Sequence, residues 1–465
     1  MTVDWRKSLK RYMTMTEKQD KTAPLHFKTG IHWFTNDLRV DDNQALLKAA
    51  EKSQRLLCVF VVDPAWFKPN RYGQKSIGDH RWQFLCESLF DLEQSLKSLG
   101  QDLVIIYESP LAALAKLISQ FNIDAILRSQ NAGVNENKQW QMLQQQYPML
   151  HFEEVVTHTL FSEASLPFAV KDLPRSFSQF RKCVEPLPSC ETVATVTDLP
   201  SPPNNLPKAR PQLPPIQTEQ KPAMFTGGTR QANKHLSNYF DSRLPSSYKQ
   251  VRNSLDGWEC STKFSPWLAS GSMSVNQVLR ALQKYEDKVE ANDSTYWIVF
   301  ELLWREYFQW LAHANSVKLF CRGGATQQKI MTSFYPERFQ RWCQGNTSFP
   351  LVNACMRQLN ATGFMSNRGR QIVASCFVNE LSLDWRYGAA YFEQQLVDYD
   401  VASNWGNWQY LAGVGADPRG QRHFNIDKQA ALYDPSNAFI NKWSGTAHID
   451  GMDSVDAADW PLVKI

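Results

Sequence analysis

The sequence has no apolar run of about 18 residues, the length that a membrane-spanning helix needs. It also has no Cys-x-x-Cys pair, although nine cysteines are scattered along the chain. This pattern favours reduced thiols in a cytoplasmic protein over a disulfide framework or a zinc site. The first 26 residues lack the apolar core of a secretory signal, so we expect them to form a loosely ordered extension.

The familiar catalytic motifs are missing as well. Neither H-E-x-x-H nor G-x-x-x-x-G-K-[ST] occurs, the first apolar run is not followed by G-x-G-x-x-G, and no G-x-S-x-G is present. We therefore expect no metal site, no P-loop and no serine-hydrolase nucleophile. The formal charge of +4 permits a nucleic-acid partner but does not require one.

Tryptophan is abundant. Sixteen tryptophans occur, and most of them lie in the C-terminal half of the chain. Core packing is the ordinary reason for such a count, because the indole ring buries a large apolar area. Their positions within the motifs described below point to a further role.

The first third of the chain alternates between two patterns. Short apolar runs at 30–34, 56–62, 103–107 and 124–128 are typical of strands buried on both faces, and helical spacing occurs at 81–99 and 111–121. This alternation predicts a doubly wound parallel α/β domain over residues 27–155.

The rest of the chain differs in composition. Residues 186–222 are rich in proline and have little periodicity, which indicates an extended connector, and we place the whole connector at 156–222. Helix-period apolar residues then recur at 231–240, 274–285, 295–311, 351–359, 370–381 and 388–396. We predict an all-α domain over 223–445 and a short C-terminal tail over 446–465.

Three segments place polar groups among apolar helices. The segment 261–267 (STKFSPW) resembles a helix start that could receive phosphate oxygens. Glu301 and Arg305 lie four residues apart beside Trp304, and the apolar surroundings favour a buried or pocket-lining ion pair over a surface pair. Arg370 and Asp398 bracket a third segment, which continues into closely spaced aromatic residues.

Long ordered stretches of the chain resemble the photolyase/cryptochrome superfamily, and most closely its cryptochrome-DASH branch. They are WFTNDLRVDDNQAL (33–46), YKQVRNSLDGWECSTKFSPWLASGSMS (248–274), FELLWREYF (300–308), GNTSFPLVNACMRQLNATGFMSNRGRQIVAS (345–375), LDWRYGAAYFEQQLVDYDVASNWGNWQYLAG (383–413) and DPRGQRHFNIDKQAALYDP (417–435). The resemblance runs from about Gly30 to Ser444, nearly the whole chain.

This resemblance implies an FAD in the helical domain, facing a central cavity. The residues implied to hold its ribityl and phosphate side are Tyr248, Ser261, Thr262, Lys263, Phe264 and Ser265. The residues implied to frame the cavity and the isoalloxazine edge are Glu301, Arg305, Asn367 and Arg370, the last paired to Asp398. Asp400 is implied to meet the adenine side or the ribityl hydroxyls, and Asn404 to face flavin N5.

The implied activity is light-driven reversal of cyclobutane pyrimidine dimers by an electron from reduced FAD. Glu301 would hydrogen-bond the pyrimidine carbonyls and Trp304 would stack on the lesion. Tyr410 and Gln371 stand where duplex-acting photolyases usually carry Trp and Met. Weaker stacking in this pocket predicts repair of dimers in single-stranded DNA and poor repair in duplex.

The resemblance also implies accessory sites. Trp408 and Trp385 match the proximal and middle members of an electron-transfer chain, but the distal position, in the segment 331–335, carries no Trp. Asn135 and Glu136 match a pair that contacts a 5,10-methenyltetrahydrofolate antenna. Arg419, Arg422 and Lys428 are candidate contacts to DNA phosphates.

Other functions stay open from the sequence. A blue-light sensor would use the same flavin, although only about 20 residues follow Ser444, whereas sensors often carry long C-terminal extensions. A flavoprotein that binds DNA or RNA without repair is a second alternative, and a 6-4 photoproduct enzyme is disfavoured because no His-rich motif occurs near 365–370. We expect a monomer. The sequence does not separate repair from sensing, nor does it give the antenna, the resting redox state of the flavin or the distal electron donor.

Overall fold

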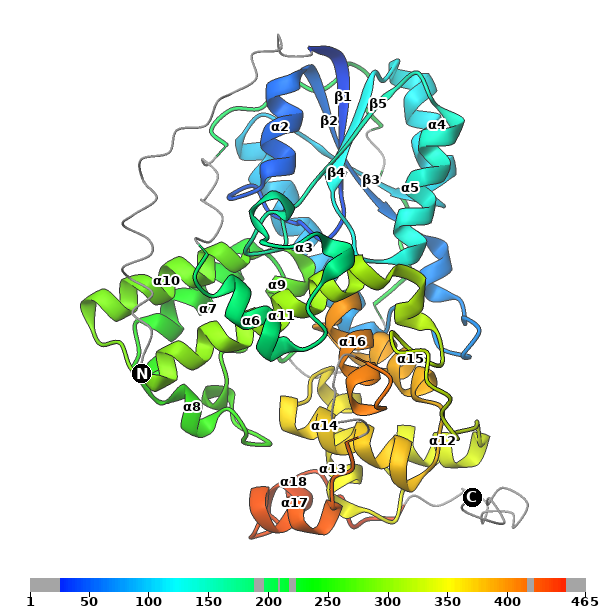
Figure 1. The fold of residues 1–465 in the computed structure, drawn as a ribbon. Helices are drawn as coiled ribbons and strands as arrows, with labels where there is room; N and C mark the ends of the chain where they lie inside the picture. The colour runs from blue at the N-terminus through cyan, green and yellow to red at the C-terminus, as the bar shows by residue number, and fades with distance from the viewer. Residues whose placement is uncertain (1–25, 188–195, 208–209, 217–222, 416–421, 449–465) are drawn as a thin grey trace.

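The computed structural model describes residues 26–187, 196–207, 210–216, 223–415 and 422–448. Figure 1 shows a layered body of sheet and helices above a larger body built from helices. The predicted combination of an α/β fold and an all-α fold is therefore confirmed.

The upper body contains one five-stranded parallel sheet. Its strands are β1 (Phe27–Phe34), β2 (Ser53–Val62), β3 (Leu103–Tyr107), β4 (Ala125–Ser129) and β5 (His151–Val155), in the order β3-β2-β1-β4-β5. The register pairs Ile31 with Leu57 on one side and with Ile126 on the other. The predicted runs match the first four strands. The fifth, HFEEV, was not predicted, because this edge strand is more polar and less buried than the others.

Helices cover both faces of this sheet. They are α2 (Gln44–Lys52), α3 (Asp79–Ser98), α4 (Pro110–Phe121) and α5 (Val134–Gln146), with a 3-10 turn η1 (Pro64–Phe67) after β2. Alternate residues of β2 enter two different cores: Leu56 and Cys58 pack with α2 and α3, whereas Leu57 and Val59 pack with α4 and α5. Burial on both faces explains the continuous apolar runs.

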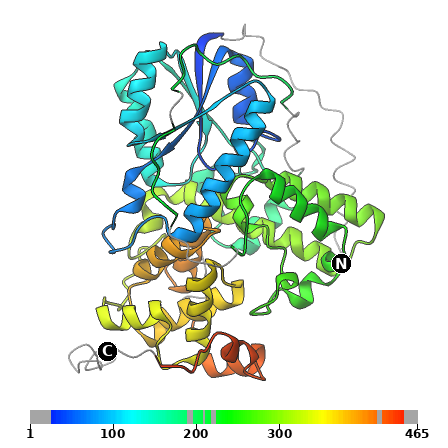
Figure 2. The ribbon, with the colours of Figure 1, turned by 180° about the vertical axis from the view of Figure 1, so that it is seen from behind.

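The connector begins with short turns and one helix. These are η2 (Glu163–Ser165), η3 (Val170–Asp172) and α6 (Phe177–Val184). Its described proline-rich parts run along the α/β domain (Figure 2), where Gln101 Nε2 donates to Pro200 O (2.8 Å) and Trp82 Nε1 to Pro214 O (3.0 Å). Val196 and Leu199 are buried against the same domain.

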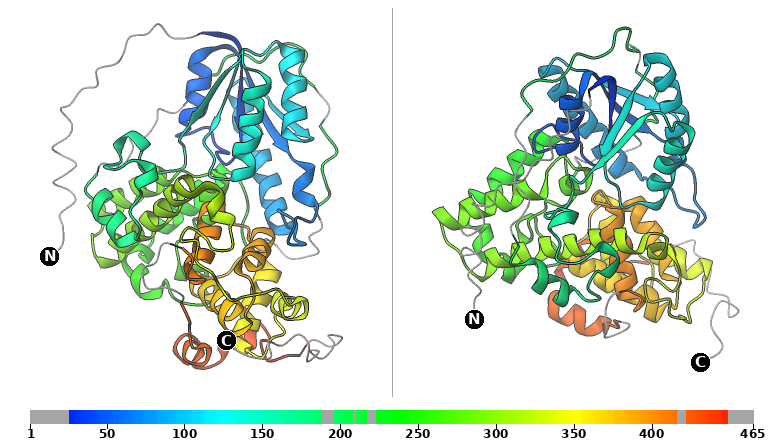
Figure 3. Two further views of the ribbon diagram at one scale, coloured as in Figure 1. Left: turned by 45° about the vertical axis from the view of Figure 1, so that its right-hand side comes forward. Right: turned by 45° about the horizontal axis from the view of Figure 1, so that its top comes forward.

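The lower body consists of helices that form two cores. The first half contains α7 (Thr229–Phe240), η4 (Leu244–Ser247), α8 (Tyr248–Val251), η5 (Trp258–Cys260), α9 (Ser265–Ser270), α10 (Val275–Lys288), α11 (Asp293–Asn315) and η6 (Ser316–Phe320). The second half contains α12 (Pro336–Gln344), α13 (Pro350–Thr362), α14 (Asn367–Ser375), a π-helical turn η7 (Cys376–Glu380), α15 (Trp385–Gln395), α16 (Val401–Leu411), α17 (Ile426–Tyr433) and α18 (Ala438–Lys442). Figure 3 shows the two halves side by side below the sheet.

The long helix α11 joins these halves. It begins where the Asn292 side chain accepts hydrogen bonds from the backbone N–H groups of Ser294 and Thr295. Its residues Leu302 and Tyr307 lie in the core of the first half, while α11 itself packs on α16 of the second half. A single helix therefore holds residues that face several neighbouring elements.

The sheet domain is docked on the helices through backbone contacts. Buried Arg39 donates to Gly271 O (2.9 Å) and Thr157 O (2.9 Å). Gly271 has a φ of +73°, and a Cβ there would overlap the backbone of Asn36. No helix in the described part of the chain is long and apolar enough to cross a membrane, and those residues contain no His, Cys, Asp and Glu group arranged to hold a metal.

Candidate functional site

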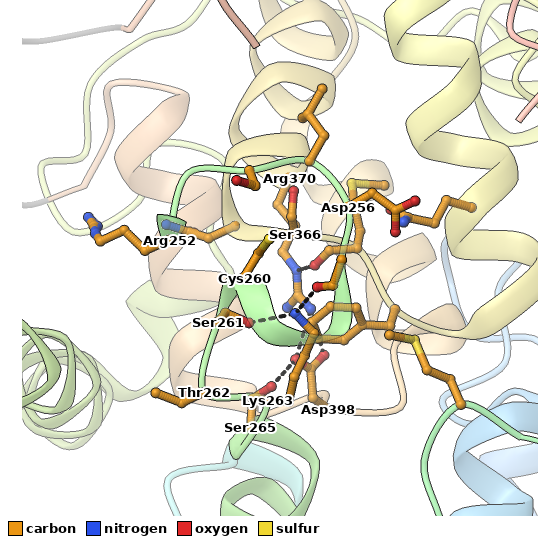
Figure 4. Close-up of a pocket in the computed structure, with 18 of the residues that line it drawn as sticks. Arg252, Asp256, Cys260, Ser261, Thr262, Lys263, Ser265, Ser366, Arg370 and Asp398 are labelled. Atoms are coloured by element: carbon orange, nitrogen blue, oxygen red, sulfur yellow. Dashed lines mark hydrogen bonds and ion pairs between the residues drawn. The ribbon is translucent and has the colours of Figure 1, made fainter. Parts of the chain in front are cut away.

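A cavity of about 220 Å³ opens between α8, the loop that leads to α9, α11 and the start of α14 (Figure 4). The residues that line it are Met224, Tyr248, Arg252, Ser254, Leu255, Asp256, Gly257, Cys260, Ser261, Thr262, Lys263, Ser265, Glu301, Gln358, Phe364, Met365, Ser366, Asn367, Arg370 and Asp398. Hydroxyl and charged groups predominate, so the cavity suits a polar ligand.

The loop before α9 is shaped around one lysine. Lys263 is only 6% exposed and adopts φ +55°, an uncommon conformation for a residue with a side chain. Its ammonium donates to Ser261 Oγ (2.7 Å) and Gly257 O (3.0 Å), and it forms no ion pair with a carboxylate of the described residues. Burial lowers the pKa of Lys263 to about 8. An anionic ligand in the cavity would stabilise the charged form of this lysine.

An ion pair forms the neighbouring part of the cavity wall. Arg370 Nη2 donates to both Asp398 oxygens (3.0 and 2.8 Å), as the resemblance implied, and Ser265 Oγ donates to Asp398 Oδ2 (2.6 Å). Ser366 caps α14 by accepting from Gly369 N (3.1 Å), which fixes the helix that carries Arg370. Figure 4 shows Ser265, Arg370 and Asp398 converging on the same side of the cavity as Lys263.

Glu301 lies in the wall formed by α11, but its partner is not the predicted one. Its carboxylate accepts from Arg252, just after α8, at 2.8–2.9 Å. Burial raises the pKa of Glu301, and Arg252 opposes that rise. Arg305 donates instead to the backbone carbonyl of His158 in the connector (2.6 Å). The predicted Glu301–Arg305 pair is therefore wrong, because α8 and the connector provide nearer partners on each side of α11.

Trp304 lies among aromatic rings beside the connector. Phe177 of α6 stacks on it with ring centroids 3.8 Å apart and an interplanar angle of 12°. Tyr410 of α16 meets it edge-on at 5.9 Å and 76°. The guanidinium of Arg422 lies over the Tyr410 ring at 4.7 Å. The structure therefore brings Trp304, Tyr410 and Arg422 together, whereas Lys428 is exposed on α17 and Arg419 lies outside the described residues.

Other predicted cofactor residues lie next to the cavity lining without being part of it. Asp400 caps α16 through Ser403 N (2.7 Å) and accepts from Gln309 Nε2 (2.9 Å). The Asn404 amide donates to Ala389 O (3.0 Å). Phe264 is 2% exposed and packs against Tyr239. Gln371 follows Arg370 on α14.

The two tryptophans of the predicted electron chain are buried. Trp408 is 2% exposed and packs against Gly388, where a Cβ would overlap its ring. Trp385 is fully buried, and its ring meets that of Trp405 at 5.8 Å. The segment that lacks the distal Trp lies beside them, because Asp384 N donates to Ser333 O (2.7 Å).

The predicted antenna pair lies at the start of α5. Asn135 is exposed, while Glu136 is half-buried near charged groups from both bodies of the molecule. Burial raises the pKa of Glu136, and Arg128 and Arg81 oppose that rise. Glu393 of α15 carries a pKa raised by burial to about 7 and interacts with Arg81 as well. Arg81 of α3 thus interacts with Glu136 of α5 and with Glu393 of α15 in a partly buried polar cluster.

Several cavity residues were not found from the sequence. Arg252 carries the countercharge to Glu301, and its signal was only its place in the stretch 248–274. Gln358 lines the cavity from α13, and its buried carbonyl oxygen has no hydrogen-bond partner among the described residues. Phe177, which stacks on Trp304 but does not line the cavity, was also missed because it lies in the connector, far from Trp304 in sequence.

The donor set of the cavity fits FAD. A buried lysine with neighbouring hydroxyls suits a diphosphate, and the orphaned oxygen of Gln358 can accept from a ligand N–H or O–H group. The Arg370–Asp398 pair presents both a donor and an acceptor to a flat polar ring edge. A two-domain molecule with such a cavity in its helical part defines the class of flavin-binding photolyase folds.

Comparisons with known proteins agree with this class. The family model described as "FAD binding domain of DNA photolyase" matches residues 297–449, and the one described as "DNA photolyase" matches residues 30–203. Cryptochrome DASH of Idiomarina loihiensis is 53% identical over 94% of this chain and 97% of the relative. Cryptochrome DASH of Vibrio parahaemolyticus is 47% identical over the same shares. The solved structure of a Synechocystis cryptochrome superposes with a TM-score of 0.85 at 36% identity, covering 90% of this chain and 88% of that one.

The chain therefore belongs to the cryptochrome-DASH branch of the photolyase/cryptochrome superfamily. The match to the FAD-binding family model supports FAD as its cofactor. A bacterial class III photolyase from Agrobacterium tumefaciens shares the fold more distantly, with a TM-score of 0.76 at 27% identity.

Proposed function

We propose that this chain is a blue-light-dependent flavoprotein that reverses cyclobutane pyrimidine dimers, preferentially in single-stranded DNA. The observation that carries the proposal is the position of Glu301. Its carboxyl lines the flavin cavity, and Trp304 follows about one turn later on the same helix. A hydrogen-bonding group in the cavity wall and an aromatic ring about one turn further along the same helix are the kinds of group that recognition of an extruded base requires.

The residues that would hold FAD are those that line the cavity. Lys263, Ser261 and Thr262 would bind the diphosphate, and Tyr248, Ser265 and Asn367 would contact the rest of the cofactor beside the Arg370–Asp398 pair. Asn404 lies on α16 and Asp400 caps that helix, and both would contact the cofactor from outside this lining. When bound, reduced and excited by blue light, FAD supplies the electron that splits the dimer.

Glu301 would recognise the lesion in its protonated form. A pyrimidine carbonyl is an acceptor, so the carboxyl must donate a hydrogen bond to it. Burial raises the pKa of Glu301, which increases the protonated fraction at a given pH. Arg252 opposes this effect. Any DNA phosphate that draws Arg252 away from the carboxylate would therefore favour the donor form.

The preference for single strands would follow from Tyr410 and Gln371. Tyr410 offers a smaller stacking surface than Trp, and its ring already carries the Arg422 guanidinium at 4.7 Å. Stacking contributes about 1–3 kcal/mol per base, so a weaker platform recovers less of the cost of opening a duplex. A lesion in single-stranded DNA avoids most of that cost. Arg422, Lys428 and Arg419 would contact DNA phosphates.

Two accessory roles complete the proposal. Trp408 and Trp385 would carry electrons to the flavin through the buried contact between α15 and α16. Glu136 and Asn135 would contact a 5,10-methenyltetrahydrofolate antenna, for which the half-buried Glu136 carboxyl near Arg128 and Arg81 would provide a polar anchor. Both roles use groups that the lesion cavity does not.

The test is blue-light-dependent loss of dimers from matched single-stranded and duplex oligonucleotides by the purified, reduced protein. Repair of the single strand, with much slower repair of the duplex, would support the proposal. Equal repair of both would refute the proposed effect of Tyr410 and Gln371. No repair of either substrate, with FAD verified by its absorption spectrum, would reject the enzymatic function and favour a light sensor.

A further inference from the structure

Five aromatic rings form a continuous row beside the cavity wall that α11 provides. The row consists of Trp297, Phe300, Phe177, Trp304 and Tyr410. Trp297 stacks on Phe300 at 4.6 Å and 16°, and Phe300 meets Phe177 edge-on at 5.1 Å. These rings belong to helices α11, α6 and α16. Figure 1 shows α6 beside α11, with α8 below them. We call this set the aromatic row.

Cations lie over the faces of this row at both ends. Lys249 Nζ is 5.0 Å and the Arg252 guanidinium 5.5 Å from the centre of the Trp297 ring. The Arg181 guanidinium lies 5.3 Å from the centre of Phe300, and Arg422 covers Tyr410. Four of the five rings are only partly buried, and Phe177 fills the gap between them. Core packing alone needs no such series of cations.

The carboxylates beside these cations are few and replaceable. Lys249 pairs with Asp293 at 3.0 Å, but the two side chains are 40% and 78% exposed, so water already screens the pair. Arg181 lies 3.8 Å from Glu185, and Arg252 pairs with Glu301. A phosphate can therefore take the place of a carboxylate at Lys249 with little loss.

We propose that the aromatic row is a binding track for the nucleotides on one side of the lesion in a single strand. This inference rests on the proposed function, since the lesion fixes the register of the strand. Partly exposed rings with basic groups over them are the combination that binds single-stranded nucleic acid without regard to sequence. The alternating charges and rings do not match an apolar helix or a lipid surface.

The geometry sets the length of the track. Trp297 and Trp304 are seven residues apart on α11, which corresponds to about 10 Å along the helix. Bases stack at about 3.4 Å, so this distance accommodates about three nucleotides. Extending a lesion-centred oligonucleotide by three nucleotides on one side should therefore tighten binding, and extension on the other side should have a smaller effect.

The experiment measures the binding of holoprotein in the dark to labelled oligothymidylates that contain one central dimer. A short oligonucleotide is compared with versions extended by three nucleotides on the 5′ or the 3′ side. We expect one extension to lower Kd by at least about fivefold, the effect of one good stacking contact. Trp297→Leu should remove that gain and Trp297→Phe should keep most of it.

The matched controls are Phe90→Leu, a 54% exposed aromatic residue on α3, and Lys116→Gln, an exposed lysine in an ion pair on α4. Lys249→Gln should reduce the slope of log K against log salt by about 0.7, the loss of one phosphate contact on a single strand. Lys116→Gln should leave the slope unchanged. Flavin absorbance and melting temperature verify that each variant is folded.

The outcomes separate this inference from the proposed function. Equal affinity of all lengths, or equal effects of Trp297→Leu and Phe90→Leu, would overturn the track even if the wild-type protein repairs the dimer. Absence of light-driven repair with a length dependence that Trp297→Leu removes would reject the repair activity and retain the track. Loss of both would reject both.

Discussion

Two faces of α11 carry similar residues in different surroundings. On the face toward the cavity, Glu301 is 28% exposed and has one charged partner, Arg252. On the opposite face, Glu306 is fully buried and accepts from Leu160 N (2.8 Å), Phe161 N (3.2 Å) and Trp310 Nε1 (2.8 Å). We call the set Glu306, Gln309 and His313 the clamp face, because these residues hold the connector and α16 against the helix.

This difference means that Glu306 contributes to the stability of the fold, whereas Glu301 is available for recognition of a ligand. Every oxygen of Glu306 is used inside the protein, so removal of its carboxyl leaves buried donors without partners. Glu301 retains capacity for an external ligand, because water reaches it and a single arginine opposes it. We therefore expect substitution of Glu306 to lower the free energy of unfolding, and substitution of Glu301 to weaken recognition of the lesion. The predictions below test this contrast.

The largest effect is expected from Glu306→Leu. Three buried N–H groups would lose their acceptor, and the free energy of unfolding should fall by about 3–5 kcal/mol. Urea denaturation measures the change. Glu306→Gln keeps one acceptor oxygen and should cost less than half as much. Glu290→Gln, at an exposed ion pair, is the control and should change little. An unchanged urea midpoint for Glu306→Leu would show that the clamp face does not secure the connector.

The second-largest effect is expected from acid, which should lower the stability of the contact between the clamp face and the connector. His158 and His313 meet with their Nε2 atoms 3.2 Å apart, near Arg305, Arg39 and Asp400. Burial lowers the pKa of His313 to about 4 and that of His158 well below its usual value. Because these folded-state pKa values are depressed, the unfolded chain binds more protons as pH falls below about 6.5, and stability is lost in that direction.

The expected loss attributable to His313 is about 2 kcal/mol between pH 7 and pH 5. Urea denaturation at both pH values measures it, and His313→Asn should flatten the difference. His448, which is exposed, provides the control variant His448→Asn. A pH dependence that persists in His313→Asn at full size would place the acid-sensitive group elsewhere.

Substitution of Glu301 on the cavity face should weaken recognition of the lesion and leave the free energy of unfolding nearly unchanged. Glu301→Ala removes the proposed hydrogen bond to the lesion, and kcat/KM for repair of a single-stranded dimer should fall about tenfold, or about 1.4 kcal/mol. Glu301→Gln keeps a donor and should retain more than a third of the activity. The pKa of Glu301 is raised, so wild-type activity should decline as pH rises through that pKa, and Glu301→Gln should abolish this decline.

The sequence predicted most of the fold because its elements have strong local patterns. Continuous apolar runs located four strands, and the periodic segment 295–311 located the body of α11, found at Asp293–Asn315. The edge strand β5 was missed because its two consecutive glutamates, which point to opposite faces of the sheet and pair with Lys52 and Arg128, interrupt the apolar run. The resemblance supplied nine of the twenty residues of the cavity lining. It could not supply Arg252 or Phe177 as partners.

Those partners lie on other elements, and helical spacing does not reveal them. Spacing placed Arg305 one turn from Glu301, and that neighbour relation is real along α11. The two side chains nevertheless have different partners, because α8 brings Arg252 to the Glu301 carboxylate and the connector places the His158 carbonyl next to Arg305. Tertiary contacts between segments far apart in sequence determined every pairing that was predicted wrongly.

The smallest effect is expected from Tyr410→Trp, at the junction of α11 and α16, where the substitution should change the ratio of duplex repair to single-strand repair. Trp enlarges the surface next to Trp304, and about 1 kcal/mol of additional stacking should raise repair of a duplex dimer about fivefold. Repair of the single strand should change less than twofold, because no duplex has to be opened there. The measurement is the ratio of the two rates under the same light. Tyr433→Trp, a partly buried tyrosine on α17, controls for the added ring. An equal increase on both substrates would mean that Tyr410 limits capture of the lesion in general and does not set the preference for single strands.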